Sequence, residues 1–98
     1  MLVRLTEVYA RGGVAAPNNY LLREIFVNPE HVVMVREERR VKEMNELGKL
    51  HEDLDPKHQF SKITVNRGTT GTEIVVIGGP DVVEEKLNSH NKRQLLKG

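Results

Sequence analysis

A β-hairpin in the second half of this sequence limits its fold more than any other feature. In residues 60–66, Ile63 and Val65 alternate with polar residues, which is the two-residue period of a strand with one buried face. Residues 67–71 (RGTTG) place a glycine on each side of a turn, and residues 72–77 (TEIVVI) return as a second strand rich in β-branched side chains. Because a lone hairpin is only marginally stable in water, the sequence predicts a larger sheet around it.

Three more strands are predicted before this hairpin, and residues that break extended structure follow the first two. Residues 1–9 are rich in leucine, valine and tyrosine, and an Arg-Gly-Gly sequence at 11–13 ends them. Residues 20–27 (YLLREIFV) form the second run, which an Asn-Pro pair interrupts, and residues 32–35 (VVMV) form the third. The sequence therefore predicts about five strands in a mostly antiparallel sheet.

A helix is predicted after the hairpin, where the hydrophobic period changes. Pro80 suits the first turn of a helix, and Val83 and Leu87 form an apolar stripe over residues 80–88. The remaining residues, 89–98, contain lysine and arginine but no acid, and are interpreted as a basic, solvated tail.

Residues 36–58 form a charged insertion of a different character. Val41, Met44, Leu47 and Leu50 recur every three residues, which is close to helical spacing but gives a narrow stripe. The segment is either a short amphipathic helix or a mobile charged excursion, and a structureless loop of this length is unusual in a small domain. We interpret it as partly helical and take these four residues as candidate partner contacts.

A single domain spanning residues 1–98 is the organisation that the length allows, because 98 residues cannot build two independent cores. Hydrophobic residues make up 38% of the chain and aromatic residues only 4%, so the core must be mainly aliphatic. The elements predict an α+β fold that is mostly β. It is a small bent antiparallel sheet of about five strands, or an Sm- or SH3-like barrel, with a C-terminal helix and the charged insertion.

Several classes of function lack their sequence signals. With no cysteine there is no disulfide, thiol nucleophile or thiolate metal site, and we see no signal peptide. No apolar run approaches the roughly 20 residues that span a bilayer, so we expect no membrane partner and a cytoplasmic location. The two serines, Ser61 and Ser89, lie in no nucleophile motif. We expect a protein that is not an enzyme, with no catalytic residue and no cofactor.

One cluster of potential metal ligands lies within the insertion. Its members are His51, Glu52, Asp53, Asp55 and His58. Two imidazoles and three carboxylates within eight residues include ligand types that suit Zn²⁺ or a harder cation. Their spacing matches neither H-E-x-x-H nor an EF-hand loop. We therefore interpret the segment as a solvated linker and predict no metal site.

Phosphate binding has two candidate locations. Gly78-Gly79 lies between a strand and a helix, as in anion-binding loops, but no G-x-G-x-x-G or G-K-[ST] motif is present, so a plain turn is the better interpretation. A basic tail beside a hairpin turn could instead meet nucleic acid. The candidate contacts for nucleic acid are Lys62, Arg67, Lys92, Arg93 and Lys97. The formal net charge of only +1 argues against a dedicated nucleic-acid binder.

The order of elements resembles the FlbD-like family of small flagellar regulators. Its "N-P-x-x-I" strand start corresponds to residues 28–33, and its "I-x-L-x-x-G" hairpin to residues 63–68. Its closing "V-x-E-x-x-x-E-V-x-x-K" unit corresponds to residues 73–76 and 81–87, and residues 1–6 are similar to its first strand. The resemblance covers about half the chain and implies a non-enzymatic accessory or regulatory protein on a small β-sheet scaffold.

Three functional hypotheses follow. The leading one is a small accessory or regulatory protein that acts by protein–protein contact or self-assembly, as a homo-oligomer or with a protein partner, using strand edges and the charged insertion. The alternative is a nucleic-acid-binding small β-barrel that uses the basic tail and hairpin turn. The third, an enzyme or metalloprotein built on His51 to His58, has the least support.

Overall fold

The computed structural model describes the backbone of residues 1–68 and 70–97, and their side chains except those of 67, 70 and 90–97. Five strands form one sheet, accompanied by two α-helices and two 3₁₀ turns, η1 (Arg11–Gly13) and η2 (Pro29–His31). The strands are β1 (Val3–Ala10), β2 (Tyr20–Val27), β3 (Val32–Glu37), β4 (Phe60–Arg67) and β5 (Thr70–Ile77), and the helices are α1 (Arg39–Glu46) and α2 (Pro80–Lys97).

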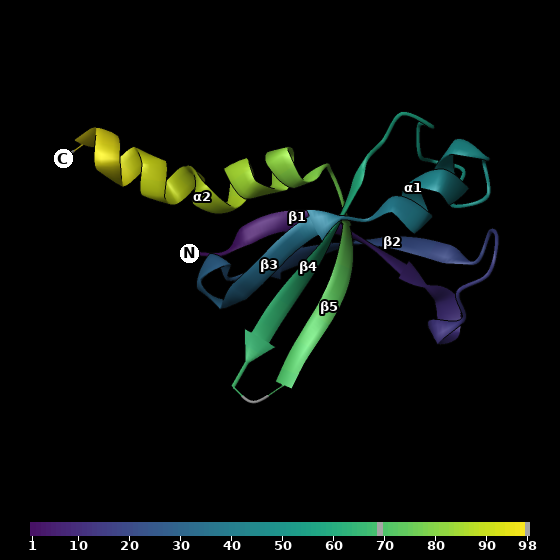
Figure 1. The fold of residues 1–98 in the computed structure, drawn as a ribbon, viewed down its shortest axis with the longest axis horizontal. Helices are drawn as coiled ribbons and strands as arrows, with labels where there is room; N and C mark the ends of the chain where they lie inside the picture. The colour runs from purple at the N-terminus through teal and green to yellow at the C-terminus, as the bar shows by residue number, and fades with distance from the viewer. Residues whose placement is uncertain (69, 98) are drawn as a thin grey trace.

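The strands lie in the order β2-β1-β5-β4-β3, and every neighbouring pair is antiparallel (Figure 1). β1 and β2 pair along their whole length, from Val3 opposite Val27 to Ala10 opposite Tyr20. The predicted α+β fold with a five-stranded antiparallel sheet is confirmed. The sheet is not closed into a barrel, because the two edge strands, β2 and β3, form no ladder with each other.

The two edge strands are nevertheless joined by a very short connection, which forces the sheet to bend. In a flat sheet four strand spacings would hold β2 and β3 about 19 Å apart. Only residues 28–31 link them, and three of these residues form η2. Pro29 begins that turn and the Asn28 side-chain oxygen accepts a hydrogen bond from the Glu30 N–H at 3.0 Å. The end of β2 and the start of β3 must therefore lie close together.

Each face of the bent sheet carries its own hydrophobic cluster. Because successive strand residues point to opposite faces, the neighbours Val75 and Val76 belong to different clusters. α2 covers the first cluster, whose buried members are Leu5, Val27, Ile63, Val76, Val83 and Leu87. α1 and the loop after it cover the second, whose buried members are Val8, Val41, Leu50 and Phe60. Figure 1 shows these two helices at opposite ends of the sheet.

The charged insertion is partly helical, and its core residues are held by packing. β3 extends to Glu37, α1 follows, and residues 47–59 form the loop that leads to β4. The side chain of Asn45, 2% exposed, donates a hydrogen bond to the Asp55 carbonyl at 2.8 Å and so ties the helix to this loop. Leu50 is 1% exposed on the same side.

Several boundaries differ from the predicted ones: β1 covers Val3–Ala10 instead of residues 1–9, and β3 continues past residue 35 to Glu37. The hairpin strands extend to Arg67 and resume at Thr70, so the turn is tighter than the predicted loop over residues 67–71, and Gly68 has a φ of 74°. α2 continues to Lys97 instead of ending near residue 88. Residues 89–97 contain no glycine or proline and are rich in lysine, arginine, glutamine and leucine, which favour a helix.

Among the described residues, neither helix has an apolar stretch long enough to cross a bilayer.

Candidate partner-binding surface

The apolar stripe predicted as a partner contact packs mainly against the chain's own sheet. Val41 and Leu50 are 7% and 1% exposed, and Met44 is half-buried against the same cluster. They contribute to the layer that covers the sheet face around Phe60. Leu47, at 69% exposed, is the member that faces solvent. Three of the four predicted contact residues are thus committed to the core.

Of the five predicted nucleic-acid contacts, the structure describes the side chain of Lys62 alone. Lys62 forms an ion pair with Glu38, Nζ to Oε2 3.3 Å, and both side chains are largely buried at 28% and 12% exposed. The Arg67 side chain and residues Lys92, Arg93 and Lys97 lie outside the side chains that the structure describes.

The other basic side chains of the strands that the structure describes also lie beside carboxylates. Arg4 contacts Glu24 at 3.6 Å and Arg36 contacts Glu73 at 3.2 Å, both between exposed side chains. Such pairs add little stability, but each of them places a negative charge next to a positive one. The described part of the sheet therefore presents no run of unopposed positive charge.

The histidine and carboxylate cluster of the insertion forms turns. The Asp53 N–H donates to Nδ1 of His51 at 3.1 Å, and the His58 ring lies 3.1 Å from the Asp55 carbonyl oxygen. Within the described residues, no three histidine, aspartate or glutamate side chains come together as a ligand set. These contacts engage both histidines in local turns.

The glycine pair between β5 and α2 is explained by the turn itself. Gly78 has a φ of 118°, a conformation that side chains rarely adopt. Its N–H donates to the Gln59 carbonyl at 2.7 Å, and its carbonyl accepts a hydrogen bond from Ser61 Oγ at 2.8 Å. Both backbone groups of Gly78 are thus used within the chain, as is the hydroxyl of the fully buried Ser61.

A buried carboxylate on β1 was not predicted from the sequence. The Glu7 side chain is 9% exposed, and its Oε1 accepts a hydrogen bond from Arg23 Nε at 2.6 Å. The hydrogen bond and the charge of Glu7 raise the pKa of Arg23, whose guanidinium also lies 4.1 Å from the centre of the Tyr9 ring. The ion pair links β1 to β2. It could have been predicted only from the cross-strand register, which places Glu7 opposite Arg23.

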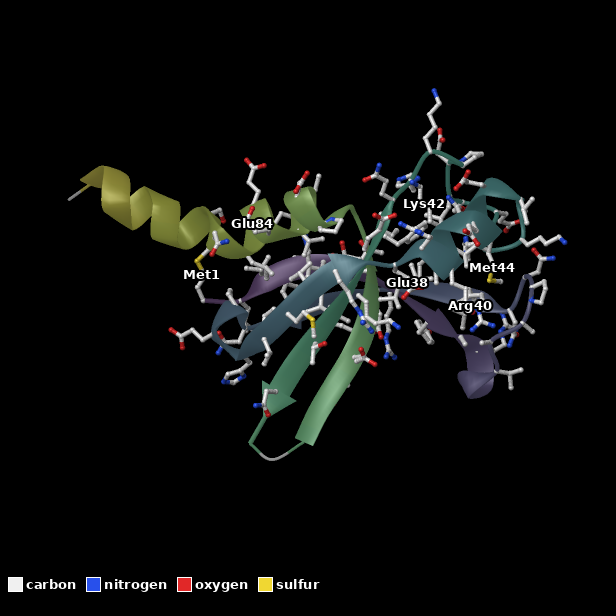
Figure 2. The ribbon with its side chains drawn as sticks, viewed as in Figure 1. Met1, Glu38, Arg40, Lys42, Met44 and Glu84 are labelled. Atoms are coloured by element: carbon white, nitrogen blue, oxygen red, sulfur yellow. The ribbon has the colours of Figure 1, made fainter. Side chains whose placement is uncertain are left out.

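A groove of about 340 Å³ lies between α2 and β3, and we call it the β3 groove. Its lining includes Val33 and Met34 of β3, Glu84 and Leu87 of α2, and Met1. Figure 2 shows Met1 beside α2, at the opposite end of the molecule from Arg40, Lys42 and Met44 on α1. This surface is therefore separate from the predicted α1 stripe.

Exposed apolar side chains gather around this groove and around a second one on the other flank of α2. Among the described residues, eight large hydrophobic side chains are exposed. Five of them line the two grooves and are called the apolar rim: Met1, Leu2, Val33, Met34 and Val82. Val33 is 63% exposed and Met34 48% exposed. Apolar side chains gathered in this way mark an interaction surface more often than scattered ones do.

The edge strand beside the groove is only partly protected against pairing, by a register shift at Val33 and by Arg36 and Glu37 at its end. Natural edge strands are blunted by charges, prolines, bulges or a covering element. β2, the other edge, carries Arg23 and Glu24 in its middle, whereas residues 32–35 of β3 are all apolar. The ladder with β4 shifts register between Val32 and Met34, so Val33 has no partner residue there. The sequence contains a signal for this exposed apolar edge: residues 32–35 (VVMV) are all apolar, instead of alternating between apolar and polar residues.

Comparison with protein-family models, with curated proteins and with solved structures found no match for this chain.

Proposed function

We propose that this chain is a small, non-enzymatic accessory or regulatory protein of the cytoplasm, which acts by binding another protein chain through β3 and the apolar rim. The observation that carries the proposal is the apolar run of the edge strand β3 beside α2, where five exposed hydrophobic residues line two grooves. Extended segments bind such edges by adding a strand, with neighbouring grooves selecting side chains.

The remaining described features support a binding role over catalysis. Both serines donate to backbone carbonyls, Ser61 to Gly78 and Ser89 to Lys86 at 3.0 Å. The resemblance to the FlbD-like family implies the same class of role. Nucleic-acid binding is the alternative, but Lys62 is neutralised by Glu38, so the described surface favours a protein partner.

A photo-crosslinking residue at position 33 tests the proposal in cells that express the full chain. We expect covalent adducts that contain a protein, because Val33 lies on the proposed contact surface. The matched control carries the same residue at position 47, since Leu47 is similarly exposed but directly follows α1, away from the β3 groove. Mass spectrometry identifies the adducts.

Adducts with nucleic acid, or equal protein adducts from both positions, would contradict the proposal. Adducts that form from position 33 and not from position 47, and that contain a different protein, would support the proposed function. This result does not depend on the further inference below.

A further inference from the structure

We infer that the β3 groove binds a segment of the partner protein in which an apolar side chain lies next to a lysine or arginine, and that Glu84 of α2 pairs with this basic residue. This inference rests on the proposed function and names the chemistry of the partner. The groove combines an apolar lining with carboxylates, so a segment that carries both an apolar and a basic residue matches it.

The apolar part of the groove continues the hydrophobic cluster that α2 covers. Val3, Val32 and Val35 line the groove, and each is a partly buried residue packed against that cluster. Val33 and Met34 add side chains that are 63% and 48% exposed. An apolar side chain that enters the groove would remove part of this surface from water, which favours binding.

The charged side chains of the groove have one sign. Among the described side chains, Glu30 of η2 and Glu84 of α2 line it, and no lysine, arginine or histidine does. The groove on the other flank of α2 differs, because Arg4 and Lys86 line it together with Glu85. A basic residue is therefore attracted to the β3 groove more than to its neighbour.

The two carboxylates of the groove are not neutralised within the described part of the chain. Every glutamate of the strands lies within 4.0 Å of an arginine: Glu7, Glu24, Glu37 and Glu73. By contrast, neither Glu30 nor Glu84 forms an ion pair with a described side chain. The sheet thus pairs its own negative charges, whereas those of the groove stay available to a bound chain.

The first three turns of α2 offer Glu84 no cation. Helical ion-pair partners lie three or four residues away, and these positions are Pro80, Asp81, Leu87 and Asn88. Asn88 Nδ2 donates a hydrogen bond to Oε1 of Glu84 at 3.1 Å, which holds the side chain beside the groove and leaves Oε2 for a basic residue. Figure 2 shows Glu84 at the same end of the molecule as Met1, which also lines the groove.

Two synthetic peptides test this chemistry with the full chain. One has the sequence Gly-Lys-Val-Lys-Val-Lys-Val-Gly, and the other has glutamate in place of each lysine. Each is titrated to about 1 mM into the nitrogen-15-labelled chain, the range in which weak complexes form, and amide chemical shifts are recorded. We expect the lysine peptide to shift the amides of residues 32–37 and 84–88, and the glutamate peptide to shift them far less.

Charge reversal in the groove gives the second part of the test. Glu84→Lys should weaken binding of the lysine peptide about fivefold or more, because it replaces an attraction by a repulsion. Glu43→Lys is the matched control, since Glu43 is an exposed helical glutamate on α1 and the variant has the same net charge. It should leave the affinity almost unchanged. The amide spectrum of each variant shows whether it folds.

Three results would overturn the inference: no shift at the groove with the lysine peptide, equal binding of both peptides, or equal weakening by Glu84→Lys and Glu43→Lys. Groove shifts that depend on protein concentration without any peptide would also overturn it, because the occupant would then be a second copy. Specific protein adducts from position 33 alongside any of these results would leave the proposed function standing with a partner of different chemistry.

Discussion

Replacing Phe60 by alanine is expected to lower the free energy of unfolding by about 3–5 kcal/mol. Phe60 is fully buried, and it packs in the cluster that includes Val8, Val41 and Leu50, between the sheet and α1. A small domain has only about 5–15 kcal/mol of total stability, so the variant should be close to unfolding. Urea denaturation followed by far-ultraviolet circular dichroism measures the loss.

The second phenylalanine provides a matched control. Phe26 lies on β2 but is 58% exposed, so Phe26→Ala removes the same atoms with little loss of burial. We expect a change of about 1 kcal/mol or less. If the two variants lose similar stability, the packing of α1 and its loop over Phe60 is not what the structure describes.

The second large effect is expected at Leu50. Leu50→Ala should cost about 2–5 kcal/mol, because the side chain is 1% exposed and its removal leaves a cavity in the cluster under the insertion. Equilibrium unfolding in urea at one fixed protein concentration measures this loss. The result distinguishes a packed insertion from a mobile charged excursion.

Leu47→Ala is the comparison, since Leu47 is three residues away and 69% exposed. We expect its loss to be small, about 0.5 kcal/mol or less, because surface substitutions seldom have a larger effect. An insertion that is mobile in solution would show small effects at both positions, and that outcome would contradict the structure of residues 39–58.

Much of the sheet could be predicted because its signals are local. The run of residues 20–27 matches β2 residue for residue, since β-branched and aromatic side chains lie between an Asn-rich loop and an Asn-Pro pair. The hairpin of β4 and β5 was equally clear, although its turn is shorter than predicted. The end of α2 was missed, because loss of the apolar stripe after Leu87 was interpreted as the end of the helix. The helix continues to Lys97, because the residues after Leu87 include many with high helix propensity.

The contact surface was harder to predict, because it depends on which faces the tertiary structure covers. A helical stripe such as Val41 and Met44 has the same sequence pattern whether it meets a partner or its own sheet. The structure shows that this stripe meets its own sheet, because Val41 and Met44 pack in the cluster around Phe60. Met34 and Val33 belong to a run that looks like an ordinary buried strand, and their exposure follows from the place of β3 at the sheet edge.

Hydrogen–deuterium exchange at β3 tests the central claim, that this edge is occupied by another chain, most directly. Antiparallel pairing adds hydrogen bonds to the outward-facing amides of an edge strand. When the protein partner captured from position 33 is added to the native chain, we predict that amides within Val32–Glu37 exchange more slowly, while those of β2, the other edge, do not change. Exchange rates in β3 that the partner leaves unchanged, or protection that develops in β2 instead, would contradict the assignment of β3 as the binding surface.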